Sequence, residues 1–195
     1  MMRDERWLKE LVKKNRSYRR FHQDVEVITK TLRDLVDLGR LSASSANRQP
    51  LKYRLVTSQS EQGDVFPCLG WAGYLEDWEG PQEGERPSAY IVFLGDTELA
   101  SSFQYDAGIA AQSMLLGAAS RGLGGCIIAS VERERLRASL DISDRYEILF
   151  VLALGKPAEK VVVEPLPPDG DIKYWRDEEG VHHVPKRGLD DLILP

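Results

Sequence analysis

The chain has 195 residues, of which 42% are hydrophobic and 29% are charged, and its formal net charge is −5. This length and composition predict one globular domain. The acidic balance argues against a nucleic-acid partner, because general nucleic-acid binding needs a basic surface that neutralises phosphates.

Other simple features narrow the class of protein further. The two cysteines are too few for a disulfide framework. The longest purely apolar run, residues 148–154, is far shorter than the roughly 20 residues of a membrane-spanning helix, so no membrane partner is expected. The first residues are charged and lack the apolar segment of a signal peptide. We therefore expect a cytoplasmic location.

The first predicted elements are two helices. Apolar residues at helical spacing predict a helix from Arg3 to Lys14. A second apolar face begins after Asp24, which can cap a helix N-terminus, and Gly39 is expected to end that helix. The small polar residues 42–50 then predict a loop.

Two predicted strands flank a long irregular segment. Residues 52–58 alternate between polar and apolar side chains, and the continuous apolar run 88–95 predicts a strand buried on both faces. The excursion 60–87 is rich in glycine and proline, which predicts irregular structure. It is either a lid over a pocket or a surface insertion that Trp71 and Trp78 anchor to the core.

A long helix without charge is the main predicted element of the second half. Asp106 is expected to cap it and Gly122 to end it, and residues 107–120 contain no charged side chain. Such a helix is buried on every side, either in the core or in a subunit interface. A strand, a solvated helix, a long apolar strand and a terminal hairpin are predicted next, at residues 125–130, 131–140, 147–155 and 172–184.

The order of these elements predicts the fold class. Helices come first, and strands interleaved with helices follow, which is typical of an α+β domain with a mixed sheet. The sequence shows no internal repeat and no linker. Residues 1–195 are therefore predicted to form a single domain, with a C-terminal hairpin and tail at 171–195.

A basic cluster, residues 13–20, is unexpected in an acidic chain. Its two lysines suit the C-terminal end of the first helix, where cations interact favourably with the helix dipole. Arg16, Ser17 and Arg19 follow in the connection, where they could bind a phosphate through forked hydrogen bonds. The alternative is a solvated basic turn that pairs with acids elsewhere.

Two further segments carry groups that could bind a ligand. Ser44, Ser45 and Asn47 have donors and acceptors that suit the polyol chain or ring edge of a cofactor, or they form an ordinary polar turn. Lys186 and Arg187 are either a second pair of phosphate ligands or surface cations that pair with nearby aspartates.

Glycines, histidines and a cysteine complete the candidates. Gly124 and Gly125 allow close approach of a ligand or form a tight turn after a helix, and their helix-to-strand order does not suit a Rossmann dinucleotide site. His182 and His183 are neighbours in a predicted strand and so point to opposite faces, which disfavours a shared metal. Cys126 lies in an apolar strand, where a thiol is usually inert. We predict no metal site and no catalytic side chain.

In combination, these motifs resemble the nitroreductase family. "NRSYRRF", "SSANRQPLKYRLV", "DAGIAAQSMLLGAASRGLGGCII" and "ILFVLALGKPAE" occur in the order of that family's signatures, namely R-S-x-R-x-F, S-x-x-N-x-Q-P, a long small-residue helix and G-L-G-x-C. The resemblance covers roughly residues 5–190 and is strongest to a compact bacterial or archaeal subgroup. Leu51 departs from it, because the family often has an aromatic residue after Q-P.

The resemblance implies a fold, a cofactor and a partner. The fold would be the nitroreductase-like α+β fold, with a mixed and mostly antiparallel sheet flanked by helices, in an intertwined homodimer. FMN would lie at the dimer interface, where the uncharged helix packs against its twin. The residues that match the family's flavin-binding positions are Arg16, Ser17, Arg19, Ser44, Ser45, Asn47, Gly124, Gly125, Ile128, Ala129, Lys186 and Arg187.

The same resemblance assigns each group a place at the flavin. The first three residues would contact phosphate, ribityl chain and ring edge. The loop that contains Ser44, Ser45 and Asn47, here called the serine loop, would reach the flavin of the other chain. The backbone at Ile128 and Ala129 would face flavin N5, and the pair Lys186 and Arg187 would close on the phosphate.

The implied reaction is a two-step ping-pong exchange on FMN. The cofactor would accept hydride from NAD(P)H and then reduce a small conjugated electrophile, such as a nitroaromatic or a quinone. The alternatives are a specialised flavin enzyme of the same fold (dehalogenase-like, enoate-type or flavin-consuming) and a flavin-binding redox module without turnover.

Overall fold

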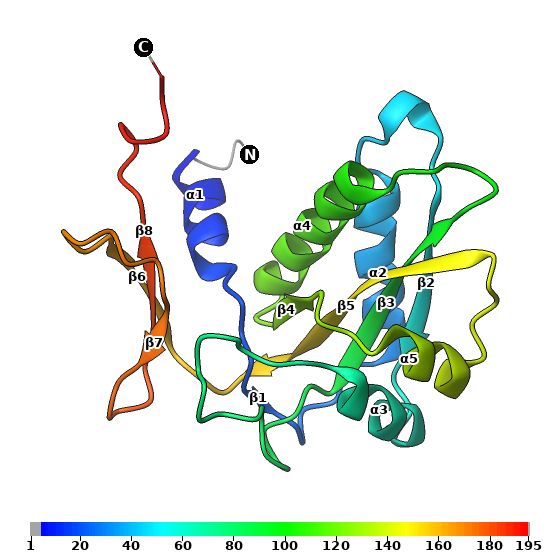
Figure 1. Cartoon of the computed structure of the whole chain (residues 1–195), viewed down its shortest axis with the longest axis horizontal. Coiled ribbons are helices and arrows are strands. Elements are labelled where there is room, and N and C mark those ends of the chain that lie inside the picture. The colour runs from blue at the N-terminus through cyan, green and yellow to red at the C-terminus, as the bar shows by residue number, and fades with distance from the viewer. Residues whose placement is uncertain (1–4, 195) are drawn as a thin grey trace.

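The centre of the protein is a five-stranded sheet, and the computed structural model describes residues 5–194 (Figure 1). The strands are β1 (Phe21–His22), β2 (Leu51–Val56), β3 (Ala89–Asp96), β4 (Gly124–Ile128) and β5 (Tyr146–Pro157). Their order is β1-β5-β3-β2, and β4 pairs with residues 151–155 of β5, next to the residues that pair with β1. All these strand pairings are antiparallel. The predicted α+β class and mostly antiparallel sheet are confirmed.

Helices cover both faces of this sheet. They are α1 (Glu5–Lys14), α2 (Thr29–Arg40), α3 (Gln59–Val65), α4 (Gln104–Ser120) and α5 (Arg133–Leu140). Because side chains of a strand alternate between its faces, Ile91 and Phe93 pack with α2 and α4, whereas Tyr90 and Val92 pack with α3 and α5. All residues of β3 are buried, as its apolar run predicts. Within residues 5–194, no helix has both the length and the apolar character needed to cross a bilayer.

Both predicted boundaries of α2 were wrong. The helix begins at Thr29, with Ile28 in the N-cap position and no side-chain cap, while Asp24 lies in a preceding turn. Gly39 is buried inside the last turn and does not end the helix. A Cβ at Gly39 would lie 2.4 Å from Cε of Met114, so this glycine lets α2 and α4 approach closely.

The α4 helix differs from its prediction in two ways. It begins at Gln104, so Asp106 lies in the first turn and does not cap the helix. The helix is not buried all round in a single chain, because Tyr105 is 78% exposed and Ile109 is 43% exposed. The exposed face nevertheless carries no formal charge, which is unusual for a helix face in contact with water.

The excursion 60–87 is only partly irregular. It contains most of α3, whose N-cap Ser58 accepts a hydrogen bond from the amide of Glu61, and the 3-10 turn η2 (Phe66–Cys68). Residues 70–87 form turns and bends without helix or strand. Trp71 packs against the core cluster under this segment, as the anchoring alternative predicts.

The end of the chain forms a second sheet, here called the C-terminal sheet. Its strands are β6 (Val161–Pro165), β7 (Trp175–Arg176) and β8 (His182–Lys186). The predicted hairpin corresponds to β7 and β8, which pair in antiparallel fashion, but β6 also pairs with β8 in parallel and was not predicted. This sheet lies on the α1 side of the molecule (Figure 1).

Candidate functional site

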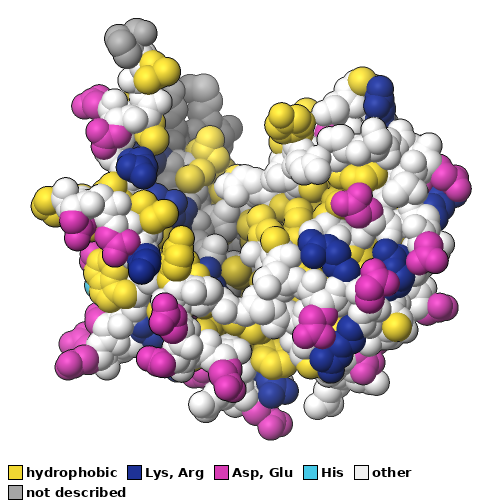
Figure 2. Space-filling model, in the orientation of Figure 1, with side chains coloured by type: hydrophobic (Ala, Val, Ile, Leu, Met, Phe, Trp, Pro, Cys, Tyr) yellow, Lys and Arg dark blue, Asp and Glu magenta, His cyan; other side chains and the backbone are white. Residues whose placement is uncertain are grey.

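A cavity of about 330 Å³ lies between the end of α1, the helix α4, the strand β4 and the C-terminal sheet. The surface is hollowed between the C-terminal sheet and the helical layers (Figure 2). The lining contains three cations and, among the described residues, no carboxylate, so the cavity favours an anion. The lining residues are Asn15, Arg16, Ser17, Arg19, Gln112, Leu115, Ile127, Tyr174, His182, Val184 and Lys186.

The two arginines of the cavity are held in different ways. Arg16 donates hydrogen bonds of 2.6 and 3.0 Å to two carbonyl oxygens at the end of α1. Arg19 donates from Nη1 to the carbonyl oxygen of Ser17 at 3.3 Å, and its guanidinium lies 4.8 Å from the ring centroid of Tyr174. The structure thus brings the predicted residues of the first motif to one place.

The two residues of the C-terminal basic pair, Lys186 and Arg187, have different surroundings. Lys186, the last residue of β8, lines the cavity. Arg187 follows the strand, is exposed and does not line it. Its predicted contact with a phosphate stays a prediction.

Gly124 and Gly125 let the basic cluster, residues 13–20 and here called the basic segment, pack closely against β4. The amide of Tyr18 donates to the carbonyl oxygen of Gly125 at 3.1 Å. A Cβ on Gly124 would lie 2.4 Å from Cδ2 of Tyr18, and one on Gly125 would lie 2.6 Å from the carbonyl oxygen of Ala153. Close packing against the Tyr18 side chain and against β5 therefore explains both glycines, and their contact with a ligand stays a prediction.

The open edge of β4 presents Ile127 to the cavity. Gly125 directs its carbonyl oxygen away from β5, and alternation along the strand directs the main-chain groups of Ile127 to the same edge. The side chain of Ile127 is 41% exposed, whereas that of Ile128 is buried in the core. Ala129 lies beyond the strand, where its carbonyl oxygen accepts from Arg133 at 3.3 Å. Neither Ile128 nor Ala129, both predicted from the resemblance, lines the cavity.

A buried carboxylate that the sequence analysis missed supports this site. The side chain of Glu159 is 1% exposed and accepts from the main-chain amides of Arg19 and Arg20 and from Nη2 of Arg176, the last at 2.9 Å. It therefore joins the basic segment to β7 of the C-terminal sheet. The local signal was an acid two residues after the longest strand, at the end of the motif "ILFVLALGKPAE", and this position by itself indicates nothing about its partners.

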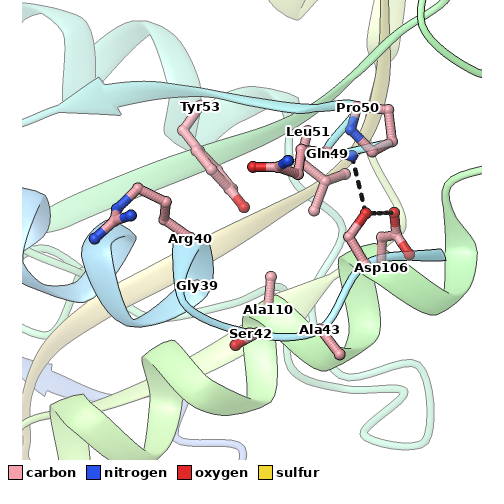
Figure 3. A pocket seen from close by; sticks show the side chains of 11 residues that line it. Gly39, Arg40, Ser42, Ala43, Gln49, Pro50, Leu51, Tyr53, Asp106 and Ala110 are labelled. Carbon is pink, nitrogen blue, oxygen red and sulfur yellow. Dashed lines mark hydrogen bonds between the residues drawn. The ribbon is translucent and has the colours of Figure 1, made fainter. Parts of the chain in front are cut away.

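The serine loop lies at a second pocket of about 190 Å³ (Figure 3). Asp106 accepts from the hydroxyl of Ser44 and the amide of Ser45, both at 2.8 Å. Burial would raise the pKa of Asp106, but its hydrogen bonds with Ser45 and Ser44 outweigh burial and lower it. Asn47 belongs to the 3-10 turn η1 (Ser45–Asn47) and has a φ of 53°, in the left-handed region that asparagine tolerates better than most residues with a side chain.

The three predicted residues of this loop therefore do not meet Arg16 and Arg19 within one chain. Ser44 lines the second pocket, and neither Ser45 nor Asn47 lines the cationic cavity. Their predicted contact with the cofactor of another chain stays a prediction.

Residues 12–156, more than half of the chain, match the nitroreductase family. The chain belongs to the nitroreductase family. This confirms the resemblance that the ordered motifs indicated. The matched region ends before the C-terminal sheet, so the wall with Tyr174, His182 and Lys186 lies outside it.

Individual relatives agree with this family and fold. The chain is 25% identical over 173 residues to the NADPH-flavin oxidoreductase of Vibrio harveyi, which covers 80% of this chain and 68% of the relative. The solved structure of the Vibrio harveyi NADPH:FMN oxidoreductase complexed with NAD⁺ matches with a TM-score of 0.64 and 24% identity, over 94% of this chain and 80% of that one. An FMN-dependent nitroreductase of Clostridium difficile R20291 matches with a TM-score of 0.63 and 23% identity, over 77% and 87% of the two chains.

Proposed function

We propose that this member of the nitroreductase family is an FMN-dependent NAD(P)H oxidoreductase. The observation that carries the proposal is a cavity lined by three cations and, within residues 5–194, by no carboxylate, beside an open strand edge. When bound, FMN would supply hydride acceptance from NAD(P)H and electron delivery to an acceptor. The likeness to the NADPH-flavin oxidoreductase of Vibrio harveyi supports both the flavin and the nicotinamide.

The lining residues fit the anionic end of FMN. Arg16, Arg19 and Lys186 would bind the phosphate through charge-assisted hydrogen bonds, and the hydroxyl of Ser17 adds a neutral donor. Because no carboxylate among the described lining residues competes for these cations, their charge remains available to the ligand.

The open edge of β4 and the side of α4 fit the remainder of the cofactor. The main-chain amide of Ile127 would donate to the ring system, since a free strand edge offers unpaired hydrogen-bonding groups. Asn15 and Gln112, joined by a hydrogen bond of 3.3 Å, supply polar groups on the opposite wall. The nearby arginines would stabilise negative charge that develops on the ring.

A homodimer would complete this site. The uncharged exposed face of α4 would pack against a second copy, and Ser44, Ser45 and Asn47 would reach the cofactor of the partner. Large apolar side chains are exposed on α4 itself and on α1, namely Trp7, Leu8, Val12, Tyr105 and Ile109. Burying these side chains against a second copy would be favourable, because it removes apolar area from water. Large exposed apolar patches are rare on monomers.

The proposed acceptor is a small conjugated electrophile, such as a nitroaromatic or a quinone, in a two-step ping-pong exchange. One cavity would then receive the nicotinamide and the acceptor in turn. The first experiment is the visible absorption spectrum of the purified protein, before and after anaerobic NADH or NADPH. A flavin spectrum that bleaches is the expected result.

The other outcomes of this experiment are equally informative. A flavin spectrum that persists with both nicotinamides would indicate a flavin-binding module or an enzyme with another reductant. A colourless protein that does not take up added FMN would refute the proposed function. Light scattering at micromolar concentration should show a dimer, and a monomer would contradict the shared site.

A further inference from the structure

His182 is a buried side chain of the cavity that the proposed function has not used. It begins β8, is 1% exposed and lines the cavity together with Arg19. It lies outside the part of the chain that matches the family. The neighbouring His183 points to the opposite face of the same strand, as alternation requires.

The contact between His182 and Arg19 defines the state of the imidazole. Nε2 of His182 lies 3.3 Å from Nη1 of Arg19. A guanidinium has only donors, so Nε2 must accept, and the ring proton must reside on Nδ1. Burial, together with the charges of Arg19 and Arg176, lowers the pKa of His182 to about 4 against the opposing influence of Glu159, which agrees with a neutral ring.

Arg19 needs this support more than Arg16 does. Two carbonyl oxygens already hold the guanidinium of Arg16, whereas Arg19 has one long hydrogen bond to the Ser17 carbonyl oxygen. The remaining constraints on Arg19 come from the C-terminal sheet and the segment before it, through His182 and the ring of Tyr174. Tyr174 and His182 contact each other, with ring centroids 5.1 Å apart.

We propose that His182 is a positioning residue that holds the Arg19 guanidinium at the cavity, ready for the anionic cofactor. The proposal rests on the proposed function, because it assumes that FMN binds in this cavity. Fixing a long side chain before binding reduces the entropy that binding must remove, so the effect should be on affinity. Nδ1 of His182 has no hydrogen-bond partner within the described part of the chain, so no other hydrogen bond competes for the ring orientation.

A double-mutant cycle on FMN affinity tests the proposal. His182→Leu removes the acceptor and should raise the dissociation constant of FMN by about fivefold to tenfold, within the usual effect of one lost intramolecular hydrogen bond. In the Arg19→Ala background the same substitution should change the dissociation constant little. His182→Gln, which keeps an acceptor oxygen, should restore most of the affinity.

His183→Gln is the matched control, because it changes the adjacent residue on the outward face of the same strand. It should lower the melting temperature yet leave the dissociation constant of FMN unchanged, measured well below unfolding. Equal effects of His182→Leu with and without Arg19 would overturn the proposal and leave His182 a packing residue.

A second measurement does not need the cofactor. Nitrogen NMR of the histidine rings in the FMN-free protein should show His182 neutral at pH 7 with its proton on Nδ1. Protonation on both nitrogens, or on Nε2 alone, would overturn the proposal. Failure of wild-type protein to bind FMN would instead refute the proposed function, while the NMR result would still decide whether His182 accepts from Arg19.

Discussion

The central sheet and the C-terminal sheet are stabilised by different forces. Every residue of β3 is buried, and Phe93 stacks on Phe150 with ring centroids 4.4 Å apart. The C-terminal sheet has short strands and exposes apolar side chains such as Val163 and Trp175, at 48% and 43%. Its side-chain contacts include ion pairs, from His183 to two carboxylates and from Arg176 to Glu159, together with stacking of Trp175 on His183.

This difference shows how the two walls of the cavity are built. The wall formed by β4 belongs to a core whose stability comes from apolar burial, which depends little on pH. The wall formed by β8 depends on charged groups, whose interactions change with protonation. The stability of the C-terminal sheet should therefore respond to pH more than the stability of the central sheet does.

The largest expected effect is in the core. Phe93→Ala should lower the free energy of unfolding by about 3–5 kcal/mol, because it removes a buried ring that also packs edge-on against Tyr53. Val163→Ala in the C-terminal sheet, where the side chain is half exposed, should change it by less than about 1 kcal/mol. Urea unfolding of both variants measures these changes in the free energy of unfolding. Similar losses in the two variants would contradict the difference between the central sheet and the C-terminal sheet.

Glu159→Gln should have the next largest effect and lower the free energy of unfolding by about 3 kcal/mol, because it leaves the guanidinium of Arg176 without its buried partner. The loss should be local. Hydrogen exchange should become faster in the C-terminal sheet and stay unchanged in β3. Unchanged protection of β8 would show that Glu159 does not join the two parts.

Lys186→Met should weaken FMN binding about tenfold, since it removes one charge-assisted contact to the phosphate. Riboflavin, which lacks the phosphate, should bind the variant and the wild type equally. Lys173→Met, at an exposed position of the same C-terminal segment, serves as the control. Equal losses for FMN and riboflavin would place the phosphate elsewhere.

The smallest expected effect is a pH dependence of stability from His183. Both ring nitrogens face carboxylates, Nδ1 at 2.5 Å from Glu164 and Nε2 at 2.9 Å from Asp177, and the hydrogen bonds to Asp177 and Glu164 raise the pKa of His183. Its stabilisation is then complete below the unfolded-state pKa of about 6.5 and is lost as pH rises through the raised folded pKa.

His183→Gln should therefore lower the melting temperature by a few degrees near pH 6 and by less near pH 9. His182, whose pKa is lowered, should give the opposite pH dependence of stability. Its contribution to stability is present above about pH 6.5 and is lost as pH falls from there to 4. A pH-independent effect of His183→Gln would show that the imidazolium does not stabilise the C-terminal sheet.

The sequence by itself was sufficient where a local pattern reports burial or a motif. The apolar runs identified β3 and β5, and the ordered motifs identified the family. They also indicated Arg16, Ser17, Arg19 and Lys186, which the structure brings to one cavity. Local patterns sufficed here because burial and backbone conformation leave a periodic trace in the chain.

Tertiary structure alone decided the features that depend on a partner distant in the chain. Gly39 lies inside the last turn of α2, where a Cβ would clash with Met114 of α4, although a glycine near that point often ends a helix. Ile127 and not Ile128 lines the cavity, because the pairing of β4 determines which side chains face outward. Glu159 and His182 acquire their contacts with the basic segment only when the C-terminal sheet packs beside it. Side-chain partners across 140 and 163 residues leave no periodic signal, so only the folded chain reveals them.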